Sequence, residues 1–217
     1  MSYQEVVSRT ASAAARAGRN ADAVTLVAVS KAKPVTDIEA VYAMGHRDFG
    51  ENRAQEMAEK ASRLPGDIRW HFVGGLQANK ARLVRPITHL LHSMDRESLG
   101  AAWAKGSDLP PPVLLQVNTG REPQKSGVMP EQARETLERI LGLGLEVRGL
   151  MAIPPISDDP QAQRPHFALL RDLRDHLSRD HAGIEELSMG MTDDFEVAVE
   201  EGSSIIRVGR AIFGERT

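Results

Sequence analysis

The chain has 217 residues, of which 41% are hydrophobic and 26% charged, and its formal net charge is −3. This length and composition fit one soluble globular domain, and the small negative charge excludes a broad electrostatic attraction to nucleic acid or anionic membranes. No apolar run approaches the roughly 20 residues of a spanning helix, and the absence of cysteine excludes disulfides and thiolate metal sites. We therefore expect a cytoplasmic protein without a membrane anchor.

Residues 1–18 are rich in alanine, serine and arginine, which is compatible with a transit peptide or with a structural first helix. Val6, Ala13 and Ala17 fall near helical spacing, and Gly18 suits the end of a helix. Glu5 is unusual in a targeting segment, and no signal-peptide core is present. We favour a first helix that is part of the fold.

Short β-rich runs alternate with helix-forming stretches along the rest of the chain. The expected strands are residues 25–30, 47–50, 70–74, 89–93, 113–118, 146–153, 185–189 and 204–208. The expected helices are residues 36–44, 53–64, 77–85, 96–105, 131–141, 164–178 and 193–200, with Thr36 and Asp193 as N-caps. Parallel strands need such crossovers, and eight of them favour a TIM-type (β/α)₈ barrel over an open sheet. Residues 1–217 are expected to form this single domain.

In such a barrel, functional side chains gather where the strands end. The last two expected strands each end in a glycine-containing segment, at Gly190 and at Gly209. Backbone N–H groups at such turns can bind a phosphate. Lys31 directly follows the first strand and is the one strand-terminal lysine. A phosphate site beside a lysine predicts a phosphorylated aldehyde that the lysine captures covalently, and pyridoxal 5'-phosphate fits best.

Several motifs together resemble the pyridoxal-phosphate homeostasis protein family, the single-domain relatives of the alanine racemase barrel. The matching segments are residues 28–34, 49–53, 70–80, 92–95, 116–118, 149–155, 187–191 and 206–214. They cover nearly the whole chain, and their combination is specific although each alone is weak. Gly75 and residues 121–125 depart from the family pattern, which affects loop conformation and any partner surface.

The resemblance implies that Lys31 forms a Schiff base with pyridoxal phosphate. Lys33 is a weaker candidate for the Schiff base. For a lone lysine, the simpler interpretation is a side chain at a strand end that extends its ammonium group into water. Arg207 is implied to face the pyridine nitrogen, with a structural ion pair as the alternative. Asn52 is expected to reach the ring hydroxyl or the lysine, or else to cap the following helix.

The expected phosphate contacts are the Ser188 hydroxyl and backbone N–H groups near Met189, Gly209 and Arg210, with ordinary turns as the alternative. His71 is more consistent with a satisfied core residue than with a cavity wall. Met151 and Met191 are expected to pack against the ring or the core, without a chemical role.

Three functions remain open from the sequence. The resemblance implies a protein that holds and delivers pyridoxal phosphate and has no robust catalytic activity. It would be a monomer or weak dimer, and its partners would be pyridoxal phosphate and the apo-enzymes that use it. The alternative is an amino-acid racemase, which needs two bases; related racemases use the lysine and a tyrosine from an additional domain. Tyr3 and Tyr42 lie in the expected first helix and in the helix after the first strand, so racemisation should be absent or incidental. The third function is a phosphosugar enzyme with Glu51 or His71 as the base.

Overall fold

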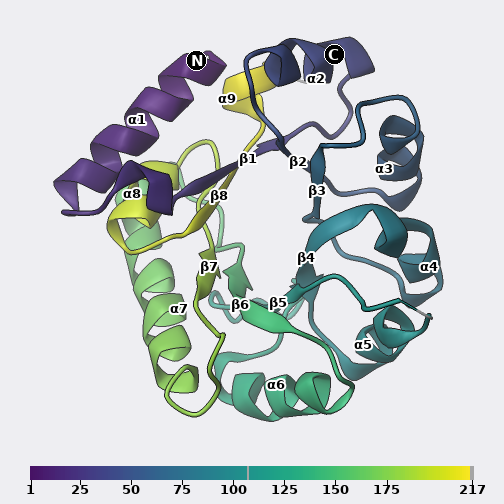
Figure 1. Ribbon diagram of the computed structural model, residues 1–217. Helices are drawn as coiled ribbons and strands as arrows, with labels where there is room; N and C mark the ends of the chain where they lie inside the picture. The colour runs from purple at the N-terminus through teal and green to yellow at the C-terminus, as the bar shows by residue number, and fades with distance from the viewer. Residues whose placement is uncertain (107, 216–217) are drawn as a thin grey trace.

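The computed structural model describes residues 1–106 and 108–215, and in this part of the chain eight parallel strands close into a barrel (Figure 1). The strands pair in chain order, and β8 returns to β1, which confirms the expected TIM-type barrel. The strands are β1 (Thr25–Val29), β2 (Asp48–Glu51), β3 (Arg69–Phe72), β4 (Thr88–Met94), β5 (Val113–Val117), β6 (Val147–Ala152), β7 (Glu186–Ser188) and β8 (Ile205–Val208).

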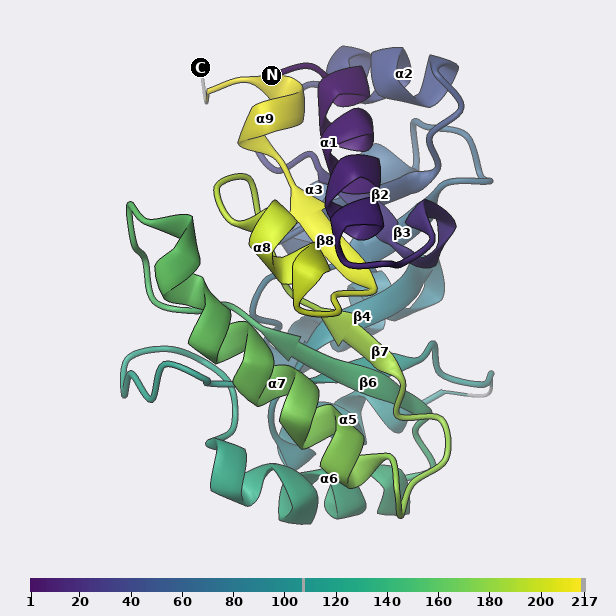
Figure 2. The same ribbon diagram turned by 90° about the vertical axis from the view of Figure 1, so that its left-hand side faces the viewer.

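Helices surround the barrel and connect its strands (Figures 1 and 2). They are α1 (Tyr3–Arg16), α2 (Val35–Ala43), α3 (Ala54–Ala61), α4 (Ala81–Val84), α5 (Glu97–Ala104), α6 (Ala133–Gly142), α7 (Arg164–Leu177), α8 (Phe195–Glu200) and α9 (Arg210–Phe213). Short 3₁₀ turns are η1 (Ala21–Ala23), η2 (Ala78–Lys80), η3 (Arg85–Ile87), η4 (Pro130–Gln132) and η5 (Pro160–Gln163). No helix among the described residues is long and apolar enough to cross a membrane.

Three local expectations were wrong in detail. The expected helix at 77–85 is broken into η2, the four-residue α4 and η3, and Pro86, which lacks an N–H, stops α-helical hydrogen bonding at its end. Helix α2 begins at Val35 rather than after Thr36, with Pro34 at the cap position and no side-chain cap. The cap of α8 is Asp194 rather than Asp193, and its carboxylate accepts from the Met191 N–H at 2.5 Å.

Two layers of side chains make the core. The outer layer lies between the strands and the helices and includes the large buried rings of Phe49, Trp103 and Phe167. A smaller cluster inside the barrel takes one residue from each of five strands. Its buried members are Val27, Leu90, Leu114, Met151 and Ile205. Alternation along each strand therefore sends successive side chains into different layers.

The N-terminal helix α1 packs on the outside of the barrel against α8 and α9, as Figures 1 and 2 show. Its buried face places Val6, Ala13 and Ala14 against an apolar cluster that includes Phe195 and Val199. Gly18, directly after the helix, has a φ of 66° and therefore adopts the left-handed conformation that glycine tolerates. The first helix is part of the fold, as expected.

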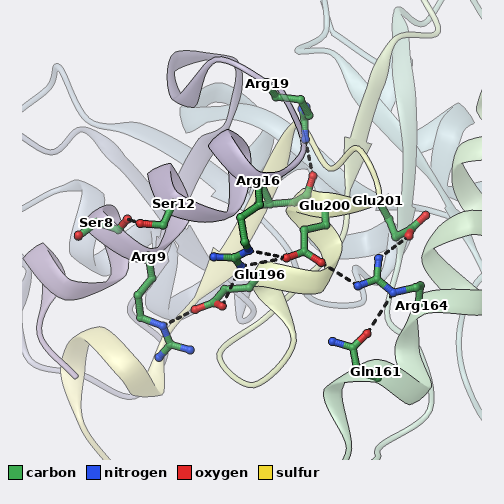
Figure 3. A network of polar contacts seen from close by, with 11 residues as sticks. Ser8, Arg9, Ser12, Arg16, Arg19, Gln161, Arg164, Glu196, Glu200 and Glu201 are labelled. Carbon is green, nitrogen blue, oxygen red and sulfur yellow. Dashed lines mark hydrogen bonds and ion pairs between the residues drawn. The ribbon is translucent and has the colours of Figure 1, made fainter.

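Ion pairs surround this contact (Figure 3). Arg16 of α1 bridges Glu196 and Glu200 of α8, with Nε 2.9 Å from Glu200 Oε1. On the other side of Glu200, Arg164 of α7 donates to it at 2.7 Å and to Glu201 at 2.6 Å. The network joins three helices. Because its charged groups are partly exposed, the apolar contact contributes more than the ion pairs to the packing of α1 on the barrel.

Candidate functional site

A cavity of about 590 Å³ opens where β1 and β8 end. Because these strands pair directly, with Ala28 opposite Val208, the residues that follow them lie at one place on the barrel rim. The cavity walls include Lys31, Asn52, Thr192, Arg207 and Gly209. Its size falls in the range of small-molecule sites. Among the described residues, no group of three or more His, Cys, Asp or Glu side chains is arranged to hold a metal ion.

Both predicted lysines border this cavity. Lys31 lies two residues after the end of β1 and is half-buried. Lys33 lies two residues further, and its Nζ donates to the backbone carbonyl of Glu215 at 2.5 Å. The structure thus gives Lys33 a carbonyl partner at the rim, while Lys31 keeps its place at the strand end.

Arg207 extends from β8 and is only 4% exposed. Its Nη1 donates to Ser188 Oγ at 2.6 Å, and its Nη2 donates to the Ala152 carbonyl at 2.9 Å. Burial lowers the pKa of Arg207 to about 10, against the opposing influence of Asp194, so the guanidinium stays charged near neutral pH. Arg207 makes no side-chain ion pair within hydrogen-bonding distance among the described residues, so the simple structural ion-pair alternative is disfavoured.

A chain of hydrogen bonds leads from Arg207 through the interior of the barrel. Ser188 Oγ lies 2.8 Å from His92 Nδ1, and His92 Nε2 lies 2.9 Å from His71 Nδ1. His71 Nε2 in turn lies 3.1 Å from a carboxylate oxygen of Asp48, which also accepts from Arg69 at 2.7 Å. His71 is therefore a hydrogen-bonded core residue, as expected, and does not line the cavity.

The chemistry of the two ends sets the direction of this chain. Arg207 can only donate, so Ser188 accepts from it and turns its own hydrogen toward His92 Nδ1. His92 then carries its proton on Nε2 and donates to His71, which donates to Asp48. Burial, followed by the neighbouring His71 and Arg207, lowers the pKa of His92 well below its usual value, which agrees with a neutral ring.

Asp48 ends this chain as a carboxylate. Burial acts to raise the pKa of Asp48, but hydrogen bonds from His71 and Arg69 outweigh it and hold that pKa well below its usual range. A charged acceptor at one end and a charged donor at the other favour this orientation of the links between them.

The position of Ser188 is at odds with a direct phosphate contact. The residue is fully buried, its hydroxyl already serves Arg207 and His92, and it does not line the cavity. Met189 is also fully buried in the outer core layer, and its N–H donates to Ile205 at 3.1 Å. Both residues are needed by the barrel itself, so neither offers a donor to the cavity in this structure.

Gly209 and Arg210 do border the cavity. A Cβ on Gly209 would lie 2.9 Å from the Val29 carbonyl, so glycine is what lets the end of β8 approach β1. Arg210 is the first residue of α9, where N–H groups have no partner within the helix, and its side chain pairs with Asp193. The backbone of these two residues, rather than the Arg210 guanidinium, is placed to meet an anion.

Thr192 is a hydroxyl residue on the cavity wall that the sequence did not single out. It lies in the loop between β7 and α8, is partly exposed, and borders the same cavity as Gly209 and Arg210. The only sequence signal is its place in the segment Gly190-Met191-Thr192, directly before two aspartates and a helix. Met191 also lines the cavity, whereas Met151 belongs to the inner core.

Asn52 lies on the cavity wall at the end of β2. Its Oδ1 is buried and has no hydrogen-bond partner among the described residues. The cap position of α3 is Arg53, without a side-chain cap, so the alternative role of Asn52 as the helix cap is not what the structure shows. This acceptor on the cavity wall is available to a donor from a ligand.

The candidate bases of the other two functions lie elsewhere. Glu51 is fully buried beneath the rim, where Ser30 and Lys60 donate to it at 2.7 and 2.6 Å, and burial raises its pKa. Tyr3 contacts His46, and Tyr42 donates to Asp67. None of Glu51, His71, Tyr3 or Tyr42 lines the cavity in the described part of the chain.

Comparison with known proteins agrees with the barrel fold. The family model described as alanine racemase, N-terminal domain, matches residues 5–217. A pyridoxal phosphate homeostasis protein of Aquifex aeolicus is 42% identical over 217 residues, covering 97% of this chain and 95% of that protein. One from Vibrio cholerae is 41% identical, covering 98% of this chain and 94% of that protein.

Solved structures show the same fold. PipY of Synechococcus elongatus, determined with PLP bound, is 36% identical with a TM-score of 0.81, covering 96% of this chain and 100% of that chain. Alanine racemase of Corynebacterium glutamicum, 16% identical with a TM-score of 0.75, shares the fold over 97% of this chain and 61% of its own.

The barrel and its matched model place the chain in the class of alanine racemase N-terminal domains. Within that class, the identities of 41–42% over nearly full length settle the closer relationship. The chain belongs to the pyridoxal phosphate homeostasis protein family.

Proposed function

We propose that this protein binds pyridoxal 5'-phosphate in the cavity at the ends of β1 and β8 and holds it through Lys31 as a Schiff base. The observation that carries the proposal is that Lys31, Asn52, Arg207 and the Gly209 turn, which are far apart in sequence, border one cavity. The PLP-bound PipY structure and the names of the relatives support the same ligand.

The residues present fit this cofactor. The unpaired Asn52 Oδ1 offers an acceptor to the ring hydroxyl, and the buried Arg207 offers donors to the pyridine nitrogen. The backbone at Gly209 and Arg210, with the Thr192 hydroxyl, would receive the phosphate. Thr192 takes the place first expected for Ser188, because Ser188 is committed to Arg207 and His92.

The bound cofactor supplies an aldehyde for imine formation and a ring that can delocalise electrons. Lys31 would hold the cofactor through its neutral Nζ, which would condense with this aldehyde and release water. Arg207, a charged donor, keeps the pyridine nitrogen unprotonated and so weakens electron withdrawal. These residues bind and orient the cofactor without promoting carbanion chemistry.

We further propose that the protein holds and delivers the cofactor rather than transforming amino acids. Racemisation needs a second base opposite the lysine, and neither described tyrosine lines the cavity. Release of Lys31 by hydrolysis of the imine would supply the cofactor to apo-enzymes that require it. The protein would act in the cytoplasm as a monomer or weak dimer.

Reduction by borohydride tests the proposal. The purified protein, loaded with pyridoxal phosphate and reduced, should carry the cofactor on the peptide containing Lys31. Lys31→Ala should abolish the absorbance of the adduct while retaining non-covalent binding, and Lys33→Ala should keep the adduct. Loss of the adduct in Lys33→Ala but not in Lys31→Ala would refute the assignment of the lysine.

A further inference from the structure

The turn that carries Lys31 has an unusual backbone. Ala32, the next residue, has a φ of 58°, a left-handed conformation that non-glycine residues seldom adopt. Such a conformation persists where surrounding contacts impose it, and it occurs often at functional sites. The contacts that impose it here come from helix α3.

Two side chains of α3 hold the peptide groups on either side of Lys31. Lys60 Nζ donates to the Ser30 carbonyl at 2.7 Å, and the Ala32 N–H donates to Glu56 Oε1 at 2.6 Å. Because Glu56 and Lys60 are four residues apart, they lie on one face of α3, and they bond to each other at 2.8 Å. Lys31 is thus the one residue between two anchored peptide groups.

The anchor is itself fixed to the barrel. Lys60 is only 5% exposed and also donates to Glu51 Oε1 at 2.6 Å, at the end of β2. The same carboxylate oxygen accepts from the Ser30 hydroxyl at 2.7 Å. Lys60 therefore ties the end of β1, the end of β2 and helix α3 together. Neither Lys60 nor Glu56 borders the Lys31 cavity, so direct cofactor contact does not explain them.

We propose that Glu56 and Lys60 are positioning residues that hold the Ser30–Ala32 turn in the conformation that presents Lys31 to the cofactor. The inference rests on the proposed function, because it assigns a role through Lys31. Without the anchor, Ala32 relaxes toward ordinary φ values, which rotates the Lys31 side chain away from the aldehyde. The phosphate and ring contacts, which come from other strands, stay in place.

Glu56→Ala is the variant of choice, because Glu56 is partly exposed, whereas removing Lys60 leaves the buried Glu51 without its cation. One charge-assisted hydrogen bond to the Ala32 N–H is lost, and we expect the equilibrium constant for the Lys31 adduct to fall about tenfold. Glu59→Ala is the matched control, since its side chain lies on the same helix, is 73% exposed and pairs with Arg63. That variant should form the adduct like the wild type.

Binding of 4'-deoxypyridoxine 5'-phosphate separates positioning from a general loss of structure. This analogue has the ring and the phosphate but no aldehyde, so its affinity should be the same in the wild type and in Glu56→Ala. In the protein without ligand, the Ala32 amide should exchange with solvent about tenfold faster in Glu56→Ala, because its acceptor is gone. Ala32→Gly should restore most of the adduct in Glu56→Ala, because glycine adopts positive φ without the anchor.

Unchanged adduct formation in folded Glu56→Ala would overturn the inference, and so would an equal loss of affinity for the aldehyde and for its deoxy analogue. A Glu59→Ala defect as large as that of Glu56→Ala would also overturn it. If the proposed function itself is wrong, the results differ: Lys31→Ala retains the adduct, or the wild type binds neither ligand. In that case the positioning role falls together with its premise.

Discussion

Ser188 and Thr192 offer a direct test of which hydroxyl serves the barrel and which serves the cavity. Ser188→Ala removes the acceptor of Arg207 Nη1 and leaves the buried Nδ1 of His92 without a partner. A lost bond to a charged group and an unsatisfied buried atom together cost about 2–4 kcal/mol of folding free energy. In a chain of this size, that lowers the melting temperature by roughly 4–16 °C.

The same substitution should leave recognition of the phosphate unchanged. Ser188 does not border the cavity, so any displacement of Arg207 affects pyridoxal phosphate and unphosphorylated pyridoxal alike. Thr192→Val should do the opposite. It keeps the shape of the side chain and the stability of the fold, but loses a donor to the phosphate, so pyridoxal phosphate binds roughly ten- to a hundredfold more weakly while pyridoxal does not.

Equilibrium titration of both variants and the wild type with the two ligands, together with thermal unfolding of each protein, measures these effects. The decisive quantity is the ratio of the two affinities. If Ser188→Ala changes this ratio, or if Thr192→Val leaves it unchanged, the assignment of the two hydroxyls is refuted. A melting temperature of Ser188→Ala equal to that of the wild type would refute the hydrogen-bond chain through His92.

Four further substitutions test other parts of the structure. Arg207→Glu should change how the absorbance of the bound cofactor depends on pH, because a carboxylate favours protonation of the pyridine nitrogen. An unchanged spectrum in the folded variant would place residue 207 away from the ring. The pKa of Asp48 is lower in the folded protein than its unfolded value of about 4, so its carboxylate stabilises the fold at pH values above about 4. This contribution is lost as the pH falls toward the folded pKa, so Asp48→Asn should lose less stability in acid than the wild type when both are unfolded with urea. Equal acid sensitivity of the two proteins would contradict this role. Val6→Ala should lower the free energy of unfolding by about 2 kcal/mol in the same assay, because Val6 is buried against α8. Arg16→Ala should lower it less, and added salt should reduce that effect further. A larger loss in Arg16→Ala than in Val6→Ala would mean that ion pairs dock α1.

The fold was readable from the sequence because its signals are local. Short β-rich runs such as 113–118 and amphipathic stretches such as 164–178 identify strands and helices by their periodicity. The place where each strand ends then indicates the expected functional rim, and the structure brings Lys31, Asn52, Arg207 and Gly209 to one cavity there. The expected helix at 77–85 was too long, because its first part forms the 3₁₀ turn η2 and only residues 81–84 are α-helical.

The sequence did not show that Ser188 faces away from the cavity, because it does not reveal which way a terminal strand residue points. Ser188 is the last residue of β7, and its side chain turns into the barrel toward His92, which is 96 residues away. Thr192, only four residues later, reaches the cavity because the loop turns back after Gly190, whose φ is 93°. The direction in which a side chain points and the path of a loop depend on closure of the barrel rather than on residue type.

The sequence by itself thus determined the order of the elements, the barrel, and the lysine and glycine turns that mark its functional rim. Only the tertiary structure decided that Arg207 is held by a chain of buried side chains ending at Asp48, and that Lys60 and Glu56 anchor the turn of Lys31. The reason is physical. Periodicity and turn chemistry act between neighbours in the chain, whereas the direction of a buried hydrogen bond or a charge pair is set by partners that closure of the barrel brings together.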